Sequence, residues 1–390
     1  MRIGLFVDAY IPEINGVVTS TKTLFDAFRA HGDDVYVVTT NPFNNKVMVE
    51  DNIIRIPGIE IKKLYGYRLS WIYNHKALNF IRKLSLDVIH VQTEASIGIF
   101  GRILAKKFNI PLVYTYHTMY IDYTYYVTKG VLDPLAKSVV KRLSKILANG
   151  STEFITTSLK TKKALRSYGI QKYINVIPNG IDIARFDRSN YQDEDFIKYR
   201  KEHNLEDTFL ILSLGRIAKE KSIDVCLKEY AEFLKTNSDI KTKFLIVGDG
   251  PAREELELLA VQLNIIDHVE FLGKVDHEMT SFYYNLCDLY ISSSTSETQG
   301  LTFIEAMASS TLVLCRYDDN LNDVIIDGKT GFFFYKEEEC HHLLSQIIKM
   351  PQEKKDLIIK DAYNNVQKYS IEKFYQSVKE VYNRAIRKRW

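Results

Sequence analysis

The sequence has no uninterrupted apolar run of about 18 residues, the length that a membrane-spanning helix needs, so no such helix is expected. It also has no recognisable signal peptide, because the apolar stretch at residues 3–7 is short and no cleavage pattern follows it. Its four cysteines lack the spacing of metal ligands and indicate buried, reduced thiols. Together these absences predict a cytoplasmic protein.

A strong net charge is absent as well, but the charge is unevenly distributed. The formal net charge is only +3. Between residues 101 and 166, however, twelve Lys and Arg residues stand against three acidic ones. Such a basic surface favours an acidic partner, and nucleic acid and an anionic membrane are both candidates.

What the sequence does contain is two successive α/β patterns. At 390 residues the chain is too long for one typical core, and its 46% hydrophobic residues are ordinary for a globular protein. Strand-like segments alternate with helical ones, which predicts parallel sheets covered by helices on both faces. The predicted strands are residues 2–7, 34–39, 88–91, 112–115, 154–156 and 174–177, then 209–214, 244–247, 269–272, 289–291 and 312–314.

A polar segment at residues 187–207 separates the two patterns. We therefore predict an α/β protein with two Rossmann-like, doubly wound domains at residues 1–185 and 186–370. A C-terminal helix at residues 371–390 is expected to return to the first domain. Ligands of such sheets bind at the carboxyl ends of the strands, and the cleft between the domains is the expected site.

The most informative motif is at residues 296–305, where Glu297 and Glu305 flank a short loop containing Gly300. A predicted strand leads into the loop and a predicted helix follows it. Backbone N–H groups at a helix N-terminus bind anions, and carboxylates accept hydrogen bonds from hydroxyls, which favours a phosphorylated sugar such as a nucleotide-sugar. The alternative is a surface acid followed by a first-turn acid that the helix dipole stabilises.

A second motif follows the first strand of the second domain. Arg216 offers a planar fork and Lys221 a mobile point charge, and this pair suits a diphosphate. The alternative is a set of solvated surface lysines, and that alternative explains Lys219 better. Arg216 and Lys221 are therefore the candidate cations of the site.

Other strand ends carry candidate residues too. In the second domain, Gly248 lies in a strand-to-helix turn, and Lys274 and Val275 end a strand where a base could lie against the backbone. In the first domain, Gly16 permits a close backbone approach before a helix whose N-terminus could face a phosphate. His117 lies just beyond a predicted strand, where a lone histidine is either structural or functional.

In type and order, these motifs resemble those of the retaining glycosyltransferases of family 4. The resemblance covers nearly the whole chain and implies the GT-B fold, in which two Rossmann-like domains face a central cleft. It also implies a hexosyltransferase that uses a nucleotide-sugar donor and needs no metal or other cofactor. Within the family, residues 4–20 and 113–123 most resemble bacterial enzymes that glucosylate diacylglycerol.

The resemblance implies four catalytic residues. Arg216 and Lys221 would neutralise the departing diphosphate, and Glu297 would hold the donor-sugar hydroxyls. His117 would lie near the sugar and the acceptor. The implied donor-binding residues are Gly16, Val17, Gly215, Gly248, Lys274, Val275, Gly300, Leu301, Thr302 and Glu305, the last on the ribose. The implied acceptor residues are Glu94, Tyr116 and Tyr120.

A helix predicted from residue 133 favours a membrane acceptor, because basic amphipathic helices lie on anionic membranes. Its basic residues are Lys137, Lys141, Arg142 and Lys145. Residues 62–83 add cations interleaved with aromatic residues, including Trp71. The alternatives are a core-packed helix with a solvated basic face and a single-stranded nucleic-acid groove. Because the strand-end motifs indicate a sugar nucleotide, the membrane is favoured and no nucleic-acid partner is expected.

The resemblance and the basic surface together predict a peripheral enzyme at the inner face of the plasma membrane. It would move glucose from UDP-glucose to diacylglycerol with retention of configuration. Two alternatives stay open. One is the same fold acting on another lipid-linked or soluble sugar acceptor, and the other is a non-catalytic protein that binds nucleotides or nucleic acid.

Overall fold

The structure, a computed structural model, describes the chain except residues 14, 44–45, 61–67, 71–73, 118–132, 295–296, 298 and 389–390. The chain forms two compact units. Unit 1 comprises Met1–Gly180 and Ile371–Trp390, and unit 2 comprises Ile181–Ser370. The division falls after Gly180 rather than after residue 185, because Ile181 and Ile183 already pack in the core of unit 2.

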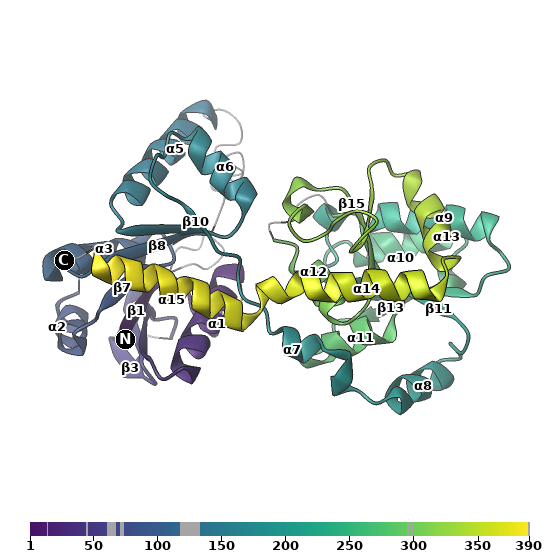
Figure 1. The fold of residues 1–390 in the computed structure, drawn as a ribbon, viewed down its shortest axis with the longest axis horizontal. Helices are drawn as coiled ribbons and strands as arrows, with labels where there is room; N and C mark the ends of the chain where they lie inside the picture. Colours follow the sequence, from purple (N-terminus) through teal and green to yellow (C-terminus); the bar gives the residue numbers. More distant parts are fainter. Residues whose placement is uncertain are drawn as a thin grey trace. The chain divides into compact units, whose positions relative to one another are not determined.

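Unit 1 contains an eight-stranded sheet with the strand order β10-β9-β8-β7-β1-β2-β4-β3 (Figure 1). Its strands are β1 (Arg2–Phe6), β2 (Asp34–Thr40), β3 (Met48–Glu50), β4 (Ile53–Ile56), β7 (Val88–Val91), β8 (Leu112–Tyr116), β9 (Glu153–Thr156) and β10 (Asn175–Val176). Neighbouring strands pair in parallel, except that β3 runs antiparallel to β4. A separate antiparallel pair joins β5 (Gly58–Glu60) to β6 (Arg68–Ser70).

Helices cover both faces of this sheet, as the apolar strands predict. They are α1 (Gly16–Ala30), α2 (His75–Leu84), α3 (Ser96–Phe108), α5 (Asp133–Asn149), α6 (Leu159–Ser167) and α15 (Ile371–Arg387). α1 and α15 pack on one face, and α2 and α3 pack on the other. Successive side chains along a strand point to opposite faces of the sheet, so each strand contributes to the cores on both faces. In β1, Ile3 and Leu5 pack with α1 and α15, and Phe6 packs with α2 and α3.

The C-terminal helix α15 is joined to the sheet by buried polar contacts. Tyr382 Oη lies 2.7 Å from His90 Nδ1, and His90 Nε2 lies 2.7 Å from Thr115 Oγ1. Burial lowers the pKa of His90 to about 3, so this imidazole is neutral. Near the end of the chain, Lys388 Nζ donates to the buried Glu153 carboxylate at 2.6 Å. The helix is therefore an integral part of unit 1.

Unit 2 contains a six-stranded sheet with the order β13-β12-β11-β14-β15-β16, and its strand pairs are all parallel. The strands are β11 (Phe209–Leu214), β12 (Thr242–Val247), β13 (Val269–Gly273), β14 (Leu289–Ser292), β15 (Leu312–Arg316) and β16 (Phe332–Phe334). The strand order reverses between β11 and β14. The loops that follow these two strands therefore leave the sheet in opposite directions, which opens a crevice at their carboxyl ends.

Helices also cover both faces of the second sheet (Figure 1). They are α7 (Ile183–Phe186), α8 (Asp193–Glu202), α9 (Ile223–Thr236), α10 (Arg253–Gln262), α11 (Thr280–Leu286), α12 (Leu301–Ala308), α13 (Glu339–Ile348) and α14 (Gln352–Val366). α9, α10 and α13 pack on one face, and α7, α11, α12 and α14 pack on the other. In both units, each strand predicted from the sequence is present within a residue or two at either end.

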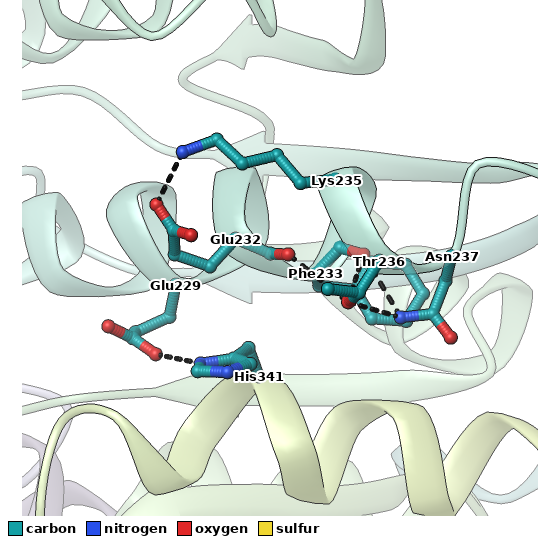
Figure 2. A network of polar contacts seen from close by, with 7 residues as sticks. All are labelled: Glu229, Glu232, Phe233, Lys235, Thr236, Asn237 and His341. Atoms are coloured by element: carbon teal, nitrogen blue, oxygen red, sulfur yellow. Dashed lines mark hydrogen bonds and ion pairs between the residues drawn. The ribbon is translucent and has the colours of Figure 1, made fainter.

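A polar contact joins α13 to α9 within the network that Figure 2 shows. His341 Nδ1 of α13 lies 2.7 Å from Glu229 Oε2 of α9. Just beyond the end of α9, the amide of Asn237 donates to the carbonyl of Phe233 at 3.0 Å. Because α9 begins two residues after Lys221, these contacts fix the helix that follows one of the predicted site residues.

Tyr382→Phe is expected to destabilise unit 1, because it leaves a nitrogen of the buried His90 without its hydrogen-bond partner. We expect the free energy of unfolding, measured by denaturant titration, to fall by about 1–3 kcal/mol. Tyr375→Phe on the same helix is the matched control, since among the described residues its hydroxyl accepts only from the half-buried Lys379 side chain. Equal losses in the two variants would contradict the importance of the His90 contact.

Candidate functional site

A cavity of about 140 Å³ lies at the carboxyl ends of β11 and β14, where the strand order of unit 2 reverses. The two strands, the loops after them and the beginnings of α9 and α12 form its walls. Five of the predicted site residues line it: Gly215, Arg216, Lys221, Glu297 and Thr302. Residues that the sequence separates widely therefore meet in one place.

Lys221 and Glu297 form an ion pair in this cavity. Lys221 ends the short 3-10 turn Lys219–Lys221, and its Nζ lies 2.7 Å from Glu297 Oε1. The glutamate is mostly buried, whereas the lysine is half-buried. Arg216 on the same wall is exposed, so its guanidinium is open to a ligand. Lys219 is exposed and lies 3.4 Å from Glu255, as expected for a solvated surface lysine.

Glycines allow the loops after β11, β12 and β13 to stack on one another. Gly215 N donates to the Val247 carbonyl at 2.9 Å, and Gly248 N donates to the Gly273 carbonyl at 2.8 Å. Gly248 has a φ of +138°, and a Cβ there would lie 1.8 Å from the Gly215 carbonyl oxygen. Backbone packing beside the cavity therefore requires a glycine at this position. This requirement explains Gly248 without any ligand.

The loop after β13 carries the two predicted base-binding residues. Lys274 is exposed, and Val275 is half-buried against the core of unit 2. Neither of them lines the cavity at β11 and β14. Their role in holding a base stays a prediction.

Gly300 precedes α12 and has a φ of +70°. A Cβ at this position would lie 2.4 Å from Leu321 Cδ2, so glycine permits both the left-handed backbone and the close packing. The first helical residues, Leu301 and Thr302, present N–H groups that lack acceptors within the helix, because the first turn of any helix leaves them unpaired. Thr302 also lines the cavity, so this helix end is available to an anionic or hydroxylated ligand.

Glu305 lies one turn further along α12 and does not line the cavity with Glu297. Tyr284 Oη donates to Glu305 Oε2 at 3.1 Å. Burial raises the pKa of this carboxyl to about 7, although the Tyr284 hydrogen bond and the nearby Arg185 charge act in the opposite direction. Glu305 can therefore exchange a proton near neutral pH.

Sequence reasoning missed several residues of this site. Ser293 Oγ donates to the Ser222 carbonyl at 2.6 Å and lies 2.9 Å from Cys226 Sγ. Burial raises the pKa of the Cys226 thiol to about 12, so it stays protonated and structural. Asn320 Nδ2 donates to the Glu297 backbone carbonyl and so positions the loop. The serines directly after β14 were a visible signal, whereas nothing local marks Asn320.

In unit 1, the predicted phosphate contact lies at the N-terminus of α1. Asn15 Oδ1 accepts hydrogen bonds from Val17 N at 3.0 Å and Val18 N at 2.9 Å, so the helix caps itself there. Gly16 is exposed, and a Cβ at Gly16 would meet no atom within 4 Å. The backbone around Gly16 is therefore open to a ligand, while the Val17 N–H is already occupied.

His117 and Glu94 lie at the carboxyl edge of the first sheet. His117 Nε2 lies 2.7 Å from Gln92 Oε1, and burial lowers the pKa of His117 to about 4. Glu94 accepts a 2.5 Å hydrogen bond from Tyr114, and Tyr116 is buried in the core. Tyr120, the third predicted acceptor residue, lies outside the described residues.

Asp8 is a further polar residue at this edge that sequence reasoning missed. Its Oδ1 accepts from Ser96 Oγ at 2.7 Å and from Ile97 N at 2.8 Å. The carboxylate thus caps α3, and the interaction with the positive end of the helix dipole stabilises the buried charge. No local pattern marks this cap, because Asp8 follows β1 and is 88 positions from Ser96 in the sequence.

The helix α5 exposes apolar as well as basic side chains. Val139, Leu143 and Ile146 are 57%, 48% and 59% exposed, at a spacing that places them on one face. Arg142 and Lys145 on the helix are also exposed, whereas Lys137 is half-buried and Lys141 lies over the ring of Tyr168. Trp71 lies outside the described residues. Among the described helices, none is long and apolar enough to cross a membrane.

Comparison with known families agrees with the two-unit architecture. A profile described as Glycosyltransferase Family 4 matches residues 14–185. A second profile, described as Glycosyl transferases group 1, matches residues 195–365. Each match covers most of one unit.

Two curated relatives match nearly the full chain. An alpha-monoglucosyldiacylglycerol synthase from Acholeplasma laidlawii is 37% identical over 391 residues, covering 98% of this chain and 96% of the relative. A protein of the same name from Streptococcus pneumoniae is 35% identical over 388 residues, covering 99% and 86%. These identities, over almost the whole of both chains, indicate common family membership.

Solved structures agree on the fold. Anabaena HepE in complex with UDP has a TM-score of 0.74 and 17% identity, covering 98% of this chain and 99% of that one. A glycosyltransferase from Rickettsia africae has a TM-score of 0.75 and 18% identity, covering 99% and 98%. At such identities the likeness shows the fold alone. The predicted fold class, GT-B with two Rossmann-like α/β domains, is confirmed.

Glu305→Gln is expected to remove a pH dependence from the stability of unit 2. Because the carboxyl pKa is raised from 4.5 to about 7, the native state holds this proton more tightly than the unfolded chain does. The free energy of unfolding of the wild type should therefore fall as the pH rises from about 4.5 to 7, by at most about 3 kcal/mol relative to the variant. Denaturant titrations of both proteins at several pH values in this window measure the difference in their free energies of unfolding. If this difference does not change with pH, the raised pKa is contradicted.

Proposed function

The chain belongs to glycosyltransferase family 4, and from this membership we propose that it moves glucose from UDP-glucose to diacylglycerol, forming an α-glucosyl glycolipid with retention of configuration. The observation that carries the proposal is the near full-length similarity to two enzymes whose name states that product. The cavity of unit 2 supports a nucleotide-sugar donor, because it combines cations, a carboxylate and a helix N-terminus.

In this proposal, Arg216 and Lys221 take up the negative charge that develops on the diphosphate as the sugar leaves. Fixed cations in a partly buried site stabilise such charge more strongly than water does, so no metal is expected to be needed. Binding of the diphosphate draws Lys221 away from Glu297, and the freed carboxylate accepts hydrogen bonds from the sugar hydroxyls. Glu305 is proposed to bind the ribose, and His117 to meet the acceptor.

Lys221→Ala and Glu297→Gln are each expected to lower kcat by about 100-fold or more, since each removes a group that acts on the reacting sugar or its leaving group. Lys219→Ala is the matched control, because Lys219 is a neighbouring exposed lysine outside the cavity. The assay supplies UDP-glucose and diacylglycerol in vesicles and identifies the lipid product and its anomeric configuration by NMR.

Two results of this assay would contradict the proposal. One is a variant of Lys221 or Glu297 that turns over at the wild-type rate. The other is a wild-type enzyme that leaves diacylglycerol unmodified but glycosylates a different lipid-linked or soluble acceptor, which would keep the donor site and replace the acceptor.

We further propose that unit 1 binds an anionic membrane surface through α5, at the inner face of the plasma membrane. A core-packed helix would bury its apolar residues and expose only its charges. α5 instead exposes Val139, Leu143 and Ile146 beside Arg142 and Lys145. Apolar side chains enter the boundary between head groups and acyl chains, while neighbouring cations attract anionic lipids, so this surface suits a membrane.

Sedimentation with anionic vesicles tests the membrane proposal. The triple variant Val139→Ser, Leu143→Ser and Ile146→Ser is expected to bind such vesicles about tenfold or more weakly, because it removes three apolar side chains that would enter the lipid. The control variant Leu258→Ser and Val261→Ser removes apolar side chains that are 63% and 54% exposed on α10 of unit 2. Equal binding of the triple variant and the wild type would exclude α5 as the membrane surface.

A further inference from the structure

Gln92 and His117 are paired at neighbouring strand ends of unit 1. Gln92 directly follows β7, His117 directly follows β8, and these two strands pair in parallel. His117 Nε2 lies 2.7 Å from Gln92 Oε1. Because a carbonyl oxygen only accepts hydrogen bonds, Nε2 carries the ring proton in this arrangement and the lone pair is on Nδ1. The contact therefore selects one of the two neutral tautomers of His117.

Gln92 is buried beside this histidine. The residue is 2% exposed, and its backbone N–H donates to the Phe6 carbonyl of β1 at 2.8 Å. Its amide carries no charge, so it accepts from the imidazole without favouring the protonated ring as a carboxylate would. Burial already lowers the pKa of His117 to about 4, and the ring is neutral near pH 7.

A second histidine, His90, lies inside β7 and cannot serve in the same way. Both of its ring nitrogens are engaged, one with Tyr382 and the other with Thr115. Nδ1 of His117, in contrast, makes no hydrogen bond to any described residue. As far as contacts with the described residues go, His117 is the one of the two that has a ring nitrogen left for a ligand.

We infer that Gln92 is a positioning residue that holds His117 in the Nε2–H tautomer, so that Nδ1 accepts a hydrogen bond from a substrate hydroxyl. The inference rests on the proposed function in one respect, namely that His117 meets the substrate. The tautomer itself does not depend on that function. A glutamine in this place thus acts on the reaction only through the orientation and protonation of the histidine.

The tautomer can be measured on the free enzyme by long-range ¹H–¹⁵N NMR correlation with ¹⁵N-labelled histidine, with His117 assigned from the spectrum of His117→Gln. We expect a protonated Nε2 and an unprotonated Nδ1 in the wild type. In Gln92→Leu we expect the second tautomer to become populated. A protonated Nδ1 in the wild type would overturn the inference, because Gln92 would then donate through its amide nitrogen.

Measurements of kcat and KM distinguish a positioning role of Gln92 from a merely structural one. Gln92→Leu is expected to lower kcat about 10–100-fold while KM for UDP-glucose stays near the wild-type value. Gln92→Glu restores an acceptor oxygen and should recover most of this loss at about pH 8, where the imidazole is neutral. Thr115→Val is the control, since it removes a buried hydroxyl of β8 whose hydrogen-bond partner is His90 and not His117. If the folded Leu and Glu variants lose kcat equally, the inference fails.

One further variant distinguishes this inference from the proposed function. If the wild type forms no glucosyl diacylglycerol, the proposed function fails, and the NMR result alone decides whether Gln92 selects the tautomer. If the wild type forms it and His117→Ala keeps the wild-type kcat, the proposed function survives. In that case the action of Gln92 through His117 is overturned.

Discussion

The parallel pairing of β11 with β14 is the constraint on which the cavity of unit 2 depends. It brings two strand ends together where their connections diverge, so the loop carrying Arg216 and Lys221 borders the same cavity as the loop carrying Glu297. The contact of Gly248 with the Gly215 carbonyl then lets the next loop close against the first. A different strand order would keep every motif in the sequence and still separate the charges, so the site is a property of the topology.

The two glutamates of the central motif differ because their surroundings differ. Glu297 faces an ammonium at 2.7 Å in a cavity that opens to solvent. Glu305, eight positions along, faces the buried hydroxyl of Tyr284 in a place where burial raises its pKa to about 7. The first therefore suits exchange of one polar partner for another on ligand binding, and the second suits a hydrogen bond to neutral hydroxyls.

Unit 1 combines buried polar contacts with exposed apolar side chains on α5. The last helix is held by His90 and Tyr382, both buried, and His117 at the carboxyl edge of the sheet is paired with Gln92. These contacts join neutral groups, so they add directionality without the desolvation cost of a buried ion pair. On its outer surface, α5 leaves three apolar side chains exposed, which a soluble protein with no partner would normally bury.

The sequence alone determined most of the parallel strands and the family of this protein. Apolar runs of strand length alternating with helical segments specify a doubly wound sheet, and glycines with charged residues just after strands mark the loops that bear the site. Only the tertiary structure decided which side chains meet. The contacts of His90 with Tyr382 and of His117 with Gln92 span 292 and 25 positions, and the Asn320 contact with Glu297 spans 23. The sequence also could not predict which face of α5 is exposed, because periodicity defines an amphipathic helix but not the neighbours against which it packs. Hydrogen bonds and burial depend on distances in space, and local sequence patterns carry no information about those distances.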